Sequence, residues 1–125
     1  MKSKILVVDD EEHIRELIRF YLDKEGFSVR EASGGEEALG ILENEYIDLA
    51  IVDIMMPVMN GYEATKMIRS LDREDAKVIP IIAMTANAFT EDRIRAKEAG
   101  MDEHVAKPVD VELLIKVIHK LVKYN

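Results

Sequence analysis

The chain has 125 residues, of which 48% are hydrophobic and none is cysteine, and its formal net charge is −8 at pH 7. This length is typical of one domain with a full hydrophobic core, which we expect to span residues 1–125. The lack of cysteine excludes disulfides, thiolate metal sites and thiol catalysis. The acidic excess lies in residues 1–90 and argues against direct binding to nucleic acid or to an anionic membrane.

The first apolar run, Ile5–Val8, is rich in β-branched residues and ends at Asp9 and Asp10. Four strongly apolar residues are too few for a signal peptide or a membrane span, so a soluble, cytoplasmic protein is expected. The run is therefore interpreted as a strand that carries two carboxylates at its end.

A helix, a strand, a second helix and a third strand follow. Apolar residues recur at helical spacing after the acidic pair, and this helix ends at Gly26. Phe27–Ala32 alternates apolar and polar residues, which is typical of a strand at the edge of a sheet. After the second helix, Leu49–Val52 is continuously apolar and ends at Asp53, which predicts a strand buried on both faces.

The next segments repeat this order. A third helix is expected after Gly61, and the polar residues 72–77 are expected to form a solvated loop. Ile81–Met84 is again apolar throughout and ends at Thr85, which predicts a fourth, buried strand.

The last third of the chain is less apolar. Residues 90–99 predict a fourth helix, with Ile94 as its main apolar anchor. His104–Ala106 is a short fifth strand that ends at Lys107 and Pro108. Asp110 is a suitable N-cap for the fifth and last helix.

Strands that alternate with helices predict an α/β protein with a doubly wound, five-stranded parallel sheet and five helices. The alternating pattern places the second strand at one edge, and the shortness of the fifth strand places it at the other. Both are satisfied by the flavodoxin-like strand order 2-1-3-4-5.

The polar residues that end the strands fall at equivalent places. Parallel strands put their carboxyl ends on one edge of the sheet, so the side chains of Asp9, Asp10, Asp53, Thr85 and Lys107 are expected to converge there. Close carboxylates repel one another by roughly 4 kcal/mol per pair at an effective dielectric near 20, and one lysine does not offset this. A hard divalent cation resolves the conflict, and Mg²⁺ suits a small site of oxygen ligands.

The three histidines are scattered along the chain, so zinc is not expected. A carboxylate beside a metal, an ammonium and a hydroxyl is the set of groups that phosphoryl transfer needs. An acyl phosphate on Asp53 would be the product.

These residues resemble a known family, the receiver domains of two-component response regulators, over essentially the whole chain. The resemblance rests on Asp9-Asp10 after the first apolar run, on Asp53-Ile54-Met55-Met56-Pro57 with Gly61, on Thr85-Ala86, and on Lys107-Pro108. It implies a phosphorelay switch, similar to a stand-alone chemotaxis regulator, rather than a turnover enzyme.

The resemblance also implies a role for each matching residue. Asp53 would accept a phosphoryl group from a histidine of a sensor kinase or a phosphotransfer protein. Asp10, Asp53 and the backbone carbonyl of Met55 would hold Mg²⁺, for which Mn²⁺ could substitute, and Asp9 would act largely through water. Lys107 and Thr85 would bind phosphoryl oxygens.

The remaining implications concern geometry and timing. The bond between Lys107 and Pro108 would be cis. His104 stands where the family usually has Tyr or Phe, and we interpret it as a switch residue that turns inward after Thr85 shifts. Met55 and Asn87 would tune the lifetime of the phosphoryl group, and Met55 favours a long one because it cannot align a water.

Three other functions fit the sequence less well. A phosphatase or mutase with an aspartate nucleophile would need a second acid at position 55, which is Met. A flavin carrier would need a phosphate-binding loop after the first strand, where residues 9–12 are all acidic. A degenerate receiver that binds partners without phosphorylation normally lacks part of the residue set.

The downstream partner is expected on the face made by the fourth helix, the fifth strand and the fifth helix. The last helix ends about where the chain ends, so we expect the protein to act on a separate partner or to pass the phosphoryl group on. It could also be one part of a larger hybrid kinase.

Overall fold

The computed structural model describes residues 2–86 and 90–122. Five parallel strands form one sheet in the order β2-β1-β3-β4-β5. The strands are β1 (Lys4–Val8), β2 (Ser28–Ala32), β3 (Leu49–Asp53), β4 (Ile81–Thr85) and β5 (Glu103–Ala106). The predicted fold class and strand order are therefore confirmed.

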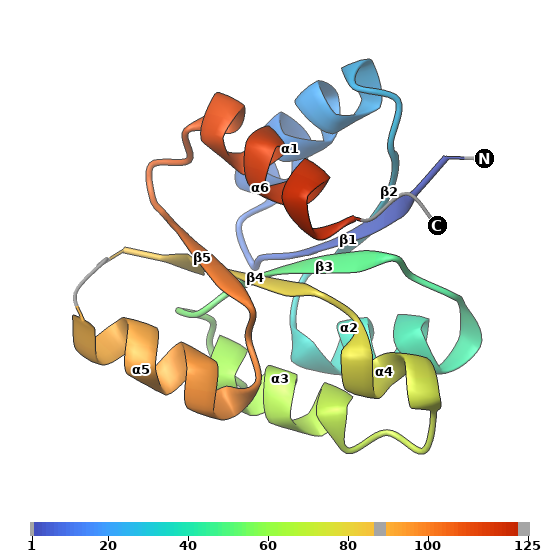
Figure 1. Ribbon diagram of the computed structural model, residues 1–125, viewed down its shortest axis with the longest axis vertical. Helices are drawn as coiled ribbons and strands as arrows, with labels where there is room; N and C mark the ends of the chain where they lie inside the picture. The colour runs from blue at the N-terminus through green and yellow to red at the C-terminus, as the bar shows by residue number, and fades with distance from the viewer. Residues whose placement is uncertain (1, 87–89, 123–125) are drawn as a thin grey trace.

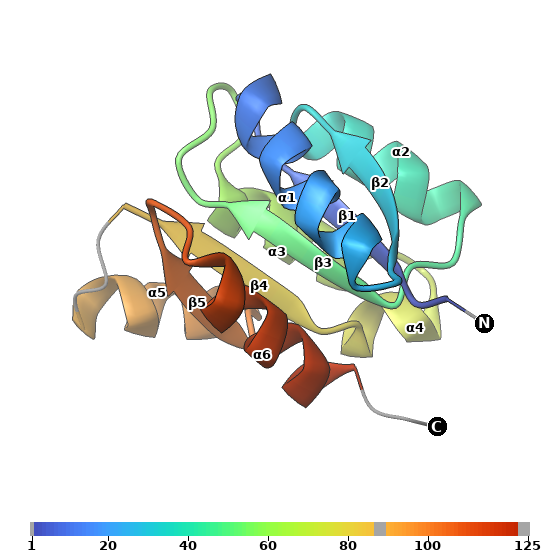
Figure 2. The same cartoon turned by 90° about the horizontal axis from the view of Figure 1, so that it is seen from above.

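Helices cover both faces of this sheet (Figure 1). They are α1 (Glu12–Lys24), α2 (Gly35–Asn44), α3 (Gly61–Arg69), α4 (Glu74–Val78), α5 (Thr90–Ala99) and α6 (Val111–Leu121). Figure 2, seen from above, places α1 and α6 together on one face, while α2, α3, α4 and α5 lie on the other. Two apolar clusters fill the spaces between the sheet and these two layers. In the described part of the chain, no helix combines the length and apolarity needed to cross a membrane.

The helix α4 differs from the sequence prediction, which makes residues 72–77 a solvated loop. Five residues are too few to show a helical period in the sequence, so tertiary contacts decide this segment. Ala76 is buried, and its carbonyl accepts a hydrogen bond from Nη1 of Arg69 at 3.0 Å. The fourth and fifth helices predicted from the sequence therefore correspond to α5 and α6 of the structure.

The predicted apolar anchor of α5, Ile94, is wrong. Ile94 is 54% exposed, whereas Ala96 and Ala99 are buried against the sheet. Small residues let this helix lie close to α3, so its inward face carries no large side chain that a hydrophobic pattern would reveal.

The strand register brings the carboxyl ends of the central strands level. Val8 pairs with Val52, so Asp9 and Asp53 occupy equivalent positions just beyond this pair. Asp53 pairs with Met84, and Thr85 pairs with Ala106 at the start of the next loop. Residues far apart in the sequence therefore meet at one edge of the sheet.

Candidate functional site

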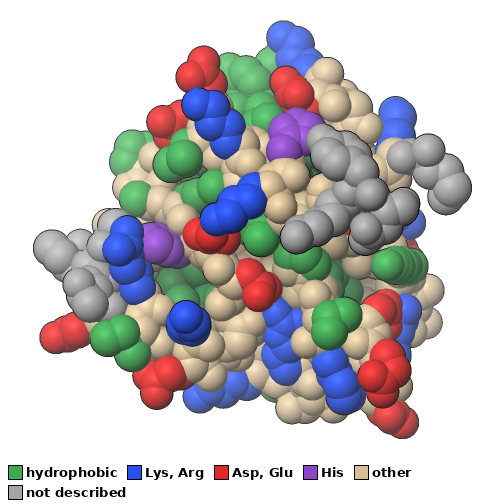
Figure 3. Space-filling view, viewed as in Figure 1, with side chains coloured by type: hydrophobic (Ala, Val, Ile, Leu, Met, Phe, Trp, Pro, Cys, Tyr) green, Lys and Arg blue, Asp and Glu red, His purple; other side chains and the backbone are tan. Residues whose placement is uncertain are grey.

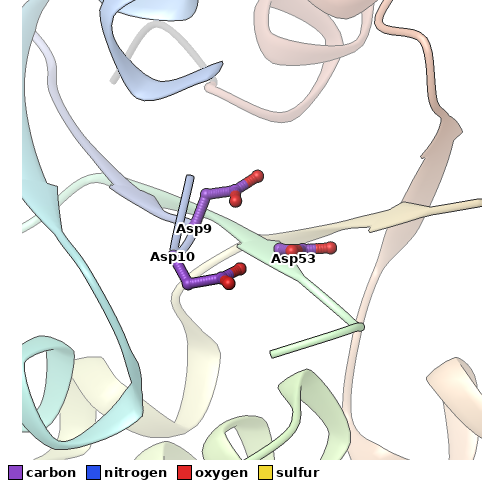
Figure 4. A group of neighbouring side chains, drawn as sticks. All are labelled: Asp9, Asp10 and Asp53. Carbon is purple, nitrogen blue, oxygen red and sulfur yellow. The ribbon is translucent and has the colours of Figure 1, made fainter. Parts of the chain in front are cut away.

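Three carboxylates gather at this edge, from the ends of β1 and β3 (Figure 4). One oxygen from each of Asp9, Asp10 and Asp53 lies within 4.8 Å of the others. Asp9 and Asp53 are buried, whereas Asp10 is exposed. The loops after parallel strands thus bring together the acidic residues that the sequence predicted.

Lys107 joins the two buried carboxylates. Its Nζ lies 3.0 Å from Oδ2 of Asp9 and 3.2 Å from Oδ2 of Asp53. The backbone N–H of Lys107 donates to the carbonyl of Thr85 at 2.8 Å, which fixes the loop after β5 against the end of β4. The peptide bond between Lys107 and Pro108 is cis.

Burial and charge together set the protonation of the acceptor. Burial, with the nearby charge of Asp9, raises the pKa of Asp53 to about 6, although Lys107 acts in the opposite direction. Burial also opposes the charge on Lys107, but its contacts with Asp9 and Asp53 outweigh this and raise the pKa of the lysine. One ammonium therefore compensates only part of the negative charge.

The loop after β3 holds Asp53 from the other side. The backbone N–H of Met55 donates to Oδ1 of Asp53 at 3.2 Å, and the N–H of Gly61 donates to the carbonyl of Ile54 at 2.9 Å. A Cβ at Gly61 would lie 2.5 Å from the carbonyl oxygen of Asp53. Only glycine allows the first turn of α3 to pack this closely against the strand end.

The other predicted site residues lie around this centre. Thr85 is buried at the end of β4, and Met55 is exposed beside Asp53. His104 lies on β5, where its Nε2 accepts a hydrogen bond from Nε of Arg93 on α5 at 2.9 Å. Asn87 lies outside the described residues.

Two features of the site were missed in the sequence. The first is Glu11, whose N–H donates to Oδ1 of Asp9 at 2.9 Å and whose carboxylate lies 3.9 Å from Nζ of Lys107. Tyr62 and Arg95 line a cavity beside Asp53, and neither residue belongs to a recognisable motif. No local pattern could have marked them, because they come from different helices.

The chemistry of this donor set fits a hard cation. Two buried carboxylates and one exposed carboxylate offer only oxygen ligands, and no sulfur or imidazole atom belongs to the group. Such a set suits Mg²⁺ better than zinc.

The family model of the response regulator receiver domain matches residues 5–119. The chain belongs to this family. Receiver domains of two-component response regulators are signalling switches rather than turnover enzymes, so this match identifies the chain as a domain of two-component signalling.

Three similar proteins illustrate the range of the family. The transcriptional regulatory protein ResD of Bacillus subtilis is 40% identical over 121 residues, which cover 94% of this receiver domain and 48% of ResD. This chain spans about half the length of several such curated relatives. The chemotaxis protein CheY4 of Vibrio cholerae is 31% identical, with a TM-score of 0.91 over 97% of this chain and 99% of that chain.

The third is the receiver domain of the sensor histidine kinase PA1611 from Pseudomonas aeruginosa. It is 32% identical, with a TM-score of 0.87 over 98% of each chain. Its structure has a magnesium ion coordinated in the active site cleft.

Proposed function

We propose that this receiver domain, acting as one unit over residues 1–125, accepts a phosphoryl group on Asp53 from a phosphohistidine of a sensor kinase or a histidine phosphotransfer protein. The observation that carries the proposal is the joint contact of Lys107 with Asp9 and Asp53 inside an acidic cluster. An ammonium this close to a buried carboxylate can neutralise oxygens of a transferring phosphoryl group as they arrive.

The proposed transfer forms one bond and breaks one bond, and it needs no third reactant. A carboxylate oxygen of Asp53 forms a bond to phosphorus, and the bond from phosphorus to the donor histidine nitrogen breaks, which returns the histidine with its electron pair. Lys107 stabilises one phosphoryl oxygen, and Thr85 at the end of β4 supplies a hydroxyl for another. Burial of Asp53 keeps water away from the nucleophile before transfer.

Asp10, Asp53 and the backbone carbonyl of Met55 are the groups proposed to hold Mg²⁺, with Asp9 acting largely through water. When bound, the ion neutralises carboxylate and phosphoryl oxygens, and Mn²⁺ could substitute because it prefers the same ligands. The magnesium in the related PA1611 receiver supports this assignment.

Phosphorylation is proposed to shift a two-state equilibrium at Thr85 and His104. In the structure, the hydrogen bond from Arg93 to His104 ties α5 to β5. An inward turn of His104 would break this bond and alter the face made by α5, β5 and α6. We propose that an unidentified downstream protein binds there.

The charges on that face fit a protein partner. Lys120 on α6 pairs with Glu103 on β5 at 2.8 Å, and acidic and basic side chains are interspersed over the face seen in Figure 3. A mixed surface of this kind is not a phosphate-binding track, so no direct contact with nucleic acid and no membrane contact is proposed.

The main test is phosphorylation in solution. The protein is incubated with Mg²⁺ and a small-molecule phosphodonor such as acetyl phosphate, and its intact mass is measured. We expect one added phosphoryl group that Asp53→Asn abolishes and that the exposed control Asp72→Asn retains. If neither small donors nor a phosphohistidine protein give an adduct, the chain is a binding module instead.

A further inference from the structure

A cavity of about 310 Å³ lies between the loop after β3 and the first turns of α5, next to the phosphoacceptor site. Its apolar wall is formed by Ile54, Met55 and Ala86, and its polar wall includes Tyr62, Asp92 and Arg95. The two helices that supply the polar wall, α3 and α5, lie side by side below the sheet in Figure 1. The volume is at the lower end of the range for small-molecule sites.

The hydroxyl group of Tyr62 is the unusual feature of this cavity. Tyr62 is only 7% exposed, and its buried oxygen has no hydrogen-bond partner within the described part of the chain. Leaving such a group unpaired is unfavourable, so buried hydroxyls normally have hydrogen-bond partners. Burial, together with the charge of Asp92, raises the pKa of Tyr62, so the group remains a neutral donor.

Two residues of opposite charge, Asp92 and Arg95, line the same cavity as Tyr62. The guanidinium carbon of Arg95 lies 4.5 Å from the centre of the Tyr62 ring, and this stacking holds the cation at the wall of the cavity. Within residues 2–86 and 90–122, neither Arg95 nor Asp92 forms an ion pair or a hydrogen bond through its side chain. The charge of Asp92 raises the pKa of Tyr62, and the charge of Arg95 lowers it.

We propose that this cavity binds a small zwitterion, an α-amino acid with an apolar side chain. The carboxylate would accept hydrogen bonds from Tyr62 and Arg95, and the ammonium would pair with Asp92. The side chain would lie against Ile54, Met55 and Ala86. A simple anion would place a negative charge next to Asp92, and a simple cation would place a positive charge next to Arg95. The two opposite charges of the cavity therefore favour a ligand that carries both a positive and a negative group.

The proposal does not depend on phosphoryl transfer, and it is tested without it. The Asp53→Asn protein is labelled with ¹⁵N and titrated, in the absence of Mg²⁺, with L-leucine, L-methionine and L-phenylalanine up to about 10 mM, which detects dissociation constants in the millimolar range. We expect saturable shifts of the amide signals of Tyr62, Ala86 and Arg95 with at least one of the three. No saturable shift with any of them would overturn the proposal.

Two analogues of leucine test the need for both charges. 4-Methylpentanoate lacks the ammonium, and 3-methylbutylamine lacks the carboxylate. Each is expected to bind at least about tenfold more weakly than leucine, since each loses one charge-assisted hydrogen-bonding group. Equal binding of either analogue would contradict the assignment of a zwitterion.

Two substitutions identify the protein groups. Tyr62→Phe removes only the hydroxyl, and because that group is unpaired, the variant should be at least as stable as its parent. Arg95→Gln removes the cation. Both should weaken amino acid binding about tenfold or more, whereas Lys97→Gln, a charge change elsewhere on α5, should leave it unchanged. Unchanged binding in Tyr62→Phe and Arg95→Gln would place the ligand elsewhere and overturn the proposal.

Discussion

Nζ of Lys107 lies 3.2 Å from Oδ2 of Asp53, and this contact joins the loop after β5 to the end of β3. The same ammonium lies 3.0 Å from Asp9, so one cation serves two buried carboxylates. A buried carboxylate without a partner is strongly disfavoured, so the lysine controls both the charge of Asp53 and its readiness to react.

Replacement of this lysine tests that control. In Lys107→Met the apolar stem is kept and the charge is lost, so the pKa of Asp53 should rise further above its value of about 6. Phosphorylation of Asp53 should slow by about 10-fold or more, because one stabilising charge is missing in the transition state. The rate is measured by intact mass, with the exposed Lys116→Met as the control. A rate equal to that of the parent would remove Lys107 from the mechanism.

The raised pKa predicts the pH range of the acceptor. Without Mg²⁺, the Asp53 carboxyl should titrate near pH 6, well above its usual value of 3.8, because burial and Asp9 favour the neutral form. Above pH 6 the nucleophilic carboxylate predominates, and below it the protonated acid cannot attack. Addition of Mg²⁺ should lower the midpoint, since a cation favours the carboxylate. The ¹³Cγ chemical shift of Asp53 reports this directly, and a metal-free midpoint near 4 would contradict the account.

The raised pKa of Asp53 also predicts that this residue lowers the free energy of unfolding at neutral pH. Its pKa is higher in the folded protein than in the unfolded one, so its contribution is favourable below about pH 4 and is lost as the pH rises through 6. Two pKa units correspond to roughly 3 kcal/mol. In metal-free protein, Asp53→Asn should therefore raise the free energy of unfolding at pH 7.5 by up to this amount, with a smaller gain at pH 4.5. Urea denaturation measures both values, and Asp72→Asn should change neither.

Two glycines provide a matched pair for the packing below the site. In Gly61→Ala the new Cβ would meet the backbone of Asp53 and Ile54 at 2.5 and 2.8 Å, so unfolding should become easier by about 2 kcal/mol or more. At Gly40 on α2 a Cβ would meet no atom within 4 Å. Gly40→Ala should stabilise the protein by about 0.5–1 kcal/mol, because alanine is the better helix former. Equal effects of the two changes in urea denaturation would show that the close approach at Gly61 is wrong.

The side chain at position 55 predicts the lifetime of the phosphoryl group. Met55 is 72% exposed beside Asp53, and its thioether cannot orient an attacking water. The phosphorylated protein should therefore persist for much longer than seconds after the donor is removed. Met55→Asn introduces hydrogen-bonding groups and should shorten the lifetime several-fold, which the decay of the phosphorylated mass measures. Loss of the group within seconds in the unaltered protein would contradict the prediction.

The sequence alone determined the order of the strands and the positions of their polar ends. Short apolar runs such as Leu49–Val52, bounded by polar residues, predict buried strands, and parallel strands put Asp9, Asp53 and Lys107 at one edge. These inferences hold because the hydrophobic period is a local property and because strands that alternate with helices leave few possible topologies.

The tertiary structure decided the rest. It made a helix of residues 74–78, exposed Ile94, and buried the hydroxyl of Tyr62 against α5 without a partner in the described chain. Each outcome depends on which surfaces meet, since five residues are too short for a period and the burial of a side chain is set by its neighbours. The distances from Lys107 to its two carboxylates were also decided by the tertiary structure. Strand order brings the residues to one edge of the sheet, but only packing fixes the contacts between their side chains.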